Sequence, residues 1–193
     1  FIYRYPKPYI ALIDGVVMGG GVGVSIHGSH RVMSERTMFA MPETGIGLIP
    51  DIGATYFLSR LPGRTGLYLG LTAARIGGAD ALHLGLATHY VPSDRMAALD
   101  TALREGDYSA SAHAAVGRIL DGFAEDPGLA PIVENLEAID RCFGGETVEQ
   151  VIAKLQAEGT PWAEETLAAL AEKSPTSLKV TFRQLTTLGD LDL

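Results

Sequence analysis

Three consecutive glycines at positions 19–21 form the first pattern in this chain that could do chemistry. They open a predicted short helix at 22–27, so their backbone N–H groups lie at a helix start. Such N–H groups present positive charge to a developing oxyanion, and the missing side chains let a carbonyl group approach closely. The glycine cluster is therefore a candidate oxyanion hole.

Two carboxylates, Glu43 and Asp51, follow in a segment at 42–53 that holds two prolines and three glycines. This composition predicts a loop without regular structure. A carboxylate on such a loop can serve as base, acid or nucleophile, particularly where apolar neighbours raise its pKa. The candidate apolar neighbours are Ile46, Leu48 and Ile49. Two carboxylates allow a division of roles.

Each of these features also has a purely structural interpretation, which the residues alone leave open. The glycines could only permit close backbone packing, and Asp51 could cap the helix that starts near Gly53. Glu43 could be an ordinary loop acid.

Other site patterns are incomplete. The glycines match neither G-x-G-x-x-G nor a phosphate-binding loop. Ser25 lacks the final glycine of a nucleophile elbow, which favours a packing role. His27 and His30 have a spacing that can share a metal, but no third ligand is suggested nearby, so we expect no metal site.

The elements that must position the candidate residues change in type along the chain. Up to about residue 92, short strands alternate with helices, and strand 9–13 is apolar on both faces, so we expect it to be covered on both sides. After residue 92 the pattern is helical. The predicted strands are 9–13, 31–33, 38–41 and 88–91, and the predicted helices are 22–27, 54–61, 65–71, 77–86, 94–103, 110–123, 131–143, 148–157, 161–172 and 177–187.

The composition excludes several classes of protein. The chain has 193 residues, 47% of them hydrophobic, and 15 basic against 23 acidic residues give a net charge of −8. This balance excludes a disordered or strongly basic protein and disfavours nucleic acid or an anionic membrane as partner. No uninterrupted apolar run suggests a membrane span. Cys142, the single cysteine, cannot form an intramolecular disulfide, so we expect a cytoplasmic protein.

Three ordered segments resemble the enoyl-CoA hydratase/isomerase (crotonase) superfamily, and within it most closely the 3-hydroxyisobutyryl-CoA hydrolases. They are residues 7–23 (KPYIALIDGVVMGGGVG), 39–47 (FAMPETGIG) and 50–53 (PDIG). Residues 174–179 (SPTSLK) resemble a segment of the hydrolase branch. The resemblance implies an α/β fold: a crotonase-like ββα spiral, incomplete at its N-terminus, in residues 1–105, and a truncated helical segment in residues 106–193.

The resemblance also implies roles for individual residues. Family members hold the carbonyl oxygen of an acyl-CoA thioester between two backbone N–H groups, and Gly20 matches the donor of one. Hydratases carry a glutamate two residues after the triple glycine, where this chain has Gly23. The hydrolase branch pairs the glutamate of its Pro-Glu loop with an aspartate eight residues later, as Glu43 and Asp51 are paired here.

The predicted function is therefore hydrolysis of a short-chain 3-hydroxyacyl-CoA, most specifically 3-hydroxyisobutyryl-CoA, a step of valine catabolism. Glu43 would attack the thioester carbonyl or activate water, and Asp51 would orient the substrate hydroxyl or assist proton transfer. Coenzyme A enters only as part of the substrate; no metal or redox cofactor is implied, and the superfamily often forms homo-oligomers. The alternatives are an isomerase or hydratase of the same superfamily and a non-catalytic fragment or interaction module.

Overall fold

The computed structural model of the chain describes residues 1–188, which fall into two compact units. Unit 1 comprises residues 1–39 and 76–130, and unit 2 comprises residues 40–75 and the chain from 131 onward. Each unit is thus assembled from two separate stretches of sequence. The boundary predicted at 105/106 follows a different criterion, because it separates the sequence that contains strands from the sequence that is purely helical. That the spiral core ends there stays a prediction.

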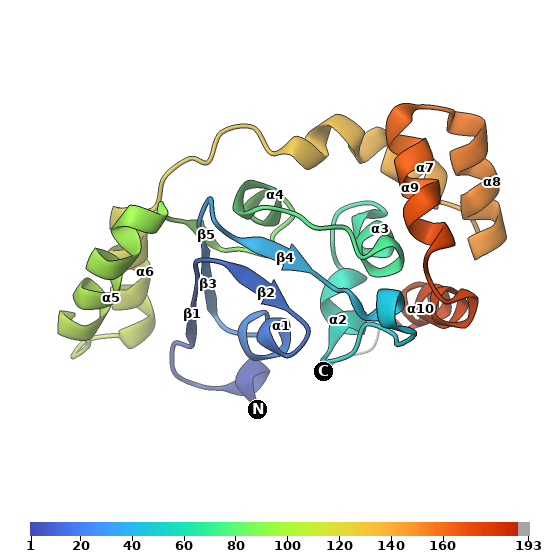
Figure 1. Ribbon diagram of the computed structural model, residues 1–193. Helices are drawn as coiled ribbons and strands as arrows, with labels where there is room; N and C mark the ends of the chain where they lie inside the picture. Colours follow the sequence, from blue (N-terminus) through green and yellow to red (C-terminus); the bar gives the residue numbers. More distant parts are fainter. Residues whose placement is uncertain (189–193) are drawn as a thin grey trace. The chain divides into compact units, whose positions relative to one another are not determined.

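Unit 1 contains the strands together with helices α1, α4, α5 and α6 (Figure 1). Its elements are η1 (Ile2–Arg4), β1 (Ile10–Ile13), β2 (Val16–Met18), α1 (Gly20–Ser25), β3 (His30–Met33), β4 (Met38–Ala40, whose last residue begins unit 2), α4 (Gly78–His83), β5 (His89–Tyr90), η3 (Ser93–Arg95), α5 (Met96–Glu105) and α6 (Ala112–Phe123).

Strands β1, β3 and β5 form a parallel sheet in that order, with Ile10 opposite His30 and Val32 opposite His89. Its core is apolar and continues into α5 and α6 through Val32, Val91, Met96, Leu99, Val116 and Leu120. The expectation that the first strand is covered on both sides is wrong for Leu12, which is 38% exposed. Strand β1 is an edge strand among the described residues, so one side of its ladder has no neighbouring strand.

A second, two-stranded sheet pairs β2 with β4. Sequence reasoning missed β2 because its three residues stand directly before the glycine cluster and offer too short a pattern. The chain then turns at Gly19, whose φ of +50° lies in the region that favours glycine, and enters α1. Gly19 thus forms the turn, and Gly20 is the first residue of the helix.

Unit 2 is helical. Its elements are η2 (Glu43–Ile46), α2 (Ala54–Leu58), α3 (Thr65–Thr72), η4 (Pro131–Asn135), α7 (Leu136–Phe143), α8 (Val148–Glu158), α9 (Pro161–Ala171) and α10 (Pro175–Thr187). The last three helices begin with hydroxyl caps, in which Thr147, Thr160 and Ser174 accept hydrogen bonds from backbone N–H groups of the first turn. The starts of α8 and α9 are those that the sequence predicts, whereas α10 begins two residues before the predicted start at 177.

Helix α3 is the centre of unit 2, and nearly all of its residues are buried. Helices α2, α7, α9 and α10 pack around it. Two glycines one turn apart permit this packing: Gly66 faces the backbone of Leu58 in α2, and Gly70 faces Leu185 in α10. Within residues 1–188, no helix is long and apolar enough to span a membrane.

Candidate active site

Glu43 is the first residue of the 3₁₀ helix η2, and Pro42 stands before it. The prediction that 42–53 lacks regular structure is therefore wrong for residues 43–46. A 3₁₀ helix needs only hydrogen bonds between residues three positions apart, and this one ends at Gly47, whose φ is +78°. The hydroxyl of Thr44, fully buried, donates to the carbonyl of Leu71 in α3 at 3.2 Å. This bond, which sequence reasoning missed, fixes the turn that carries Glu43.

The carboxylate of Glu43 is buried in a way that suits acid–base or nucleophilic chemistry. The residue is only 6% exposed, and among the described residues its Oε2 is a buried atom without a hydrogen-bond partner. Burial raises the pKa of this carboxyl, and the charge of Asp51 raises it further, while its own backbone N–H opposes both. The two predicted carboxylates are thus close enough to interact electrostatically.

The burial of Glu43 does not come from the neighbours that the sequence suggests. Ile46 is 73% and Leu48 57% exposed, so the hypothesis that they desolvate the carboxylate is wrong. Ile49 is half-buried. Turn η2 instead packs against α3 and α10, which are distant in sequence. Local composition therefore identified the carboxylate but not the helices against which its turn packs.

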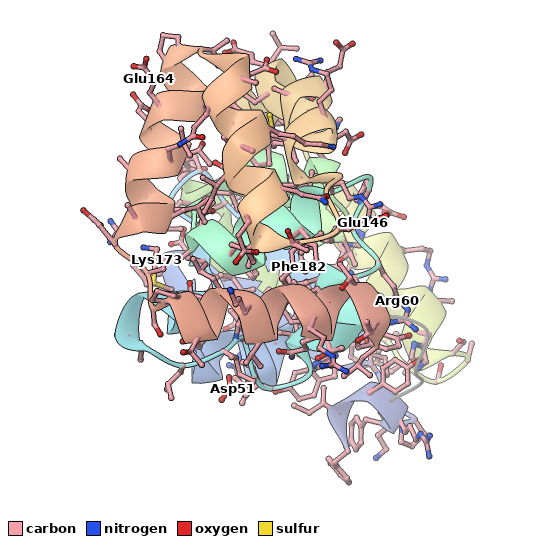
Figure 2. The ribbon with its side chains drawn as sticks, turned by 90° about the vertical axis from the view of Figure 1, so that its right-hand side faces the viewer. Asp51, Arg60, Glu146, Glu164, Lys173 and Phe182 are labelled. Carbon is pink, nitrogen blue, oxygen red and sulfur yellow. The ribbon has the colours of Figure 1, made fainter. Side chains whose placement is uncertain are left out.

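Asp51 is exposed on the loop between η2 and α2, which Figure 2 shows beside α10. Its side chain does not cap α2: the N-cap is Gly53, and only the backbone carbonyl of Asp51 accepts a bond, from Ala54 N–H at 2.8 Å. The helix-cap interpretation is therefore wrong. The next residue, Ile52, has φ +47°, an unfavourable conformation for a β-branched side chain. Strained backbone of this kind persists mainly at functional sites.

Gly20 is the first residue of α1, as the glycine pattern predicts, and it is exposed. The N–H of a first helical residue has no partner within its own helix. No atom lies within 4 Å of the place where a Cβ on Gly20 would stand, so tight packing does not explain this glycine. Gly20 belongs to unit 1, whereas Glu43 and Asp51 belong to unit 2.

The incomplete motifs have structural roles. Ser25 is buried and donates its hydroxyl to the carbonyl of Gly21 at 2.7 Å within α1, which confirms that it is a helix or packing residue. The ring of His30 stacks on His89 at 6.1 Å, so the histidine lies in a ring cluster. Over residues 1–188, no group of three histidine, cysteine or acidic side chains is arranged to hold a metal ion.

Comparisons with known proteins show which family the chain belongs to. The 3-hydroxyisobutyryl-CoA hydrolase of Danio rerio is 47% identical over 189 residues, and 3-hydroxyisobutyryl-CoA hydrolase 1 of Arabidopsis thaliana is 46% identical over 187. The matches cover 95% and 94% of this chain but 49% of each relative, so the chain spans about half the length of these relatives.

The crystal structure of a carnitinyl-CoA dehydratase from Mycobacterium thermoresistibile is also similar, with a TM-score of 0.90 and 43% identity. The match covers 99% of this chain and 54% of that one, which confirms the predicted crotonase-like α/β fold with C-terminal helices. The family profile described as enoyl-CoA hydratase/isomerase matches residues 1–193. The chain is a member of the enoyl-CoA hydratase/isomerase family.

Proposed function

We propose that this protein hydrolyses the thioester of a short-chain 3-hydroxyacyl-CoA, with 3-hydroxyisobutyryl-CoA, an intermediate of valine breakdown, as the specific substrate. The observation that carries the proposal is the buried carboxylate of Glu43, whose pKa is raised by burial and by Asp51. The similarity to relatives named 3-hydroxyisobutyryl-CoA hydrolases supports the choice of substrate. Because the chain spans about half of those relatives, the activity is proposed for the whole protein that contains it.

Hydrolysis adds water across the bond between the acyl carbon and sulfur. Glu43 either removes a proton from water or attacks the carbonyl to give an anhydride that water then cleaves. In both routes the carbon–sulfur bond breaks, the thiolate of coenzyme A takes a proton, and the carbonyl oxygen carries negative charge on the way. Gly20 N–H is the proposed donor to that oxygen, and Asp51 is proposed to orient the substrate hydroxyl or assist proton transfer.

A second candidate function is water addition to, or elimination from, an enoyl-CoA, because a carnitinyl-CoA dehydratase has a similar structure. The resemblance argues against it at one position. Hydratases use a second glutamate where this chain has Gly23, so Glu43 lacks that acid–base partner.

Release of free coenzyme A tests the choice. The 193-residue chain and the longest reading frame that contains it are assayed with 3-hydroxyisobutyryl-CoA for thiol and with crotonyl-CoA for loss of enoyl absorbance. We expect thiol release by the longer protein. Loss of enoyl absorbance without thiol release would replace hydrolysis by hydration, and silence of the longer protein in both assays would support the non-catalytic alternative.

The rate of thioester cleavage should depend on the ionisation of Glu43. Its carboxylate must be charged to act as base or nucleophile, so turnover falls as the pH drops through its pKa. Because burial raises that pKa, the acid limb of the pH–kcat profile is expected above the value of about 4.3 of an ordinary glutamate. Asp51→Asn removes one cause of the raised pKa and should move the limb to lower pH. If the acid limb of the profile lay at the pKa of an ordinary glutamate in both the parent and Asp51→Asn, the ionisation of a buried Glu43 would not control turnover.

Asp51→Asn should also lower kcat by about 10- to 100-fold, since a positioned proton-transfer group contributes that much or more. The melting temperature should not fall, because the side chain caps no helix and is exposed. Turnover and thermal denaturation of the same preparation check both statements. A lower melting temperature with unchanged turnover would assign Asp51 a structural role.

A further inference from the structure

The side-chain amide of Gln184 reaches from α10 to the loop that carries Asp51. Its Nε2 donates to the carbonyl of Pro50 at 3.0 Å and to the hydroxyl of Thr55. Pro50 precedes Asp51, and Thr55 lies in the first turn of α2, so the two acceptors stand on either side of the loop's last residues. One amide thus joins both ends of the segment that holds Asp51.

The orientation of this amide is set by its acceptors. The carbonyl of Pro50 can only accept a hydrogen bond, so the NH₂ group must face it. The amide oxygen, Oε1, then lies buried with no hydrogen-bond partner among the described residues. A buried amide oxygen without a donor is costly, so the two bonds donated by Nε2 are the hydrogen bonds that offset the burial of this amide.

The strained backbone between the two acceptors must be stabilised by contacts with other parts of the chain. Ile52 sits at φ +47°, a conformation that an unconstrained β-branched residue leaves for the extended or right-handed regions. Asp51 itself contributes only its backbone carbonyl to the hydrogen bonds of this turn. Without a fixed distance between Pro50 and Thr55, the loop can relax and turn the carboxylate of Asp51 away from its present direction.

Gln184 is carried by helix α10, the helix on which Figure 2 labels Phe182. Its first turn is capped by Ser174, which accepts from Ser177 N–H at 3.3 Å, and Pro175 occupies the first helical position. Phe182 and Leu185, on either side of Gln184 in sequence, are both buried. The SPTSLK segment, which the proposed chemistry leaves without a role, therefore starts the helix that carries the amide.

We propose that Gln184 is a positioning residue: its amide holds the Pro50–Thr55 segment in the strained conformation that directs Asp51. The inference rests on the proposed function only for its effect on turnover. The hold on the loop is a property of unit 2 alone and is measured without substrate.

The test compares Gln184→Met with Gln156→Met. Methionine keeps the approximate length of glutamine and removes both donors, and Gln156 is exposed on α8, so it controls for the same change in the same unit. We expect the rate of amide hydrogen exchange in residues 51–55 to rise by about tenfold in Gln184→Met and to stay unchanged in Gln156→Met. The reason is that loss of stabilising hydrogen bonds makes local opening of a segment more frequent. Exchange in α8 and α9 should stay unchanged. Equal exchange at 51–55 in the two variants would overturn the proposal.

Kinetics and a second substitution separate the positioning role from loss of stability. Gln184→Met should lower kcat for thioester cleavage by about tenfold with little change in KM, because Asp51 is misdirected while acyl-CoA still binds. Thr55→Val removes one acceptor, and the double variant should exchange no faster than Gln184→Met alone. Additive effects, or an unchanged kcat in an active protein, would overturn the positioning role. If the unsubstituted protein releases no thiol but the two glutamine variants show the expected difference in hydrogen exchange, the proposed function is overturned. The stabilisation of the loop by Gln184 is then still supported.

Discussion

Replacing Glu43 by glutamine is expected to lower thioester cleavage by about a thousandfold in the protein that contains this chain, because the group that acts as base or nucleophile is removed. Glutamine has nearly the same shape, so the buried site is conserved and acyl-CoA binding should be largely intact. The measurement is kcat for release of coenzyme A, together with the dissociation constant of the acyl-CoA for the variant.

Measuring the stability of Glu43→Gln distinguishes loss of catalysis from unfolding of the variant. A carboxyl whose pKa is raised in the folded state contributes stability that is present below its unfolded pKa and is lost as the pH rises through its folded pKa. At neutral pH the buried charge of Glu43 is therefore unfavourable, and glutamine should leave the protein at least as stable as the parent. The advantage should shrink as the pH is lowered through the pKa of Glu43.

Glu164→Gln is the matched control, because Glu164 is exposed near the start of α9 in the same unit and Figure 2 shows it at the end of that helix away from Lys173. Its turnover should equal that of the parent. Equal turnover in Glu43→Gln and the parent would exclude Glu43 from the chemistry.

The largest effect on stability is expected from Gly66→Ala in α3. A Cβ built on Gly66 would stand 1.8 Å from the carbonyl oxygen of Leu58 and 2.6 Å from its carbonyl carbon. Both are backbone atoms of α2, so no side chain can turn away and the two helices must separate. Overpacking of a core commonly costs about 1–3 kcal/mol, and a clash with backbone belongs to the upper end or beyond it, about 3–5 kcal/mol.

Thermal or denaturant unfolding followed by circular dichroism measures this change. Gly117→Ala is the control: Gly117 lies inside α6, and no atom stands within 4 Å of its added Cβ. That substitution should stabilise the protein by about 0.5–1 kcal/mol, since alanine is the better helix former. A Gly66→Ala protein as stable as the parent would mean that α2 and α3 are not packed as closely as described.

The sequence predicts the elements of this protein well wherever a local signal marks them. Hydroxyl caps and proline mark the starts of α8, α9 and α10, and the apolar run at 9–13 marks β1. The glycines at 19–21 correctly predict a helix start. Strand β2 was missed because three residues beside a glycine cluster carry too little pattern, and the turn η2 was missed because Pro and Gly suggest only irregular backbone.

The site was predictable in its residue types but not in what surrounds them. Glu43 and Asp51 could be singled out from a loop, yet the turn that carries Glu43 packs against α3 and α10, which no local pattern connects to it. The bond from Thr44 to Leu71 spans 27 residues and that from Gln184 to Pro50 spans 134. Contacts over such distances are set by the tertiary packing of unit 2, so spacing along the chain gives no sign of them.

Hydrolysis in water enriched in oxygen-18 shows whether water cleaves the thioester. The longest reading frame that contains this chain is incubated with 3-hydroxyisobutyryl-CoA, and the products are analysed by mass spectrometry. Thioester hydrolysis predicts free coenzyme A and, after many turnovers, 3-hydroxyisobutyrate with oxygen-18 in its carboxylate. In a single turnover, oxygen-18 in the peptide containing Glu43, with unlabelled product, would identify Glu43 as the nucleophile and its carbonyl carbon as the atom that water attacks. An acyl group that stays on coenzyme A, with or without oxygen-18 elsewhere in its chain, would contradict thioester hydrolysis.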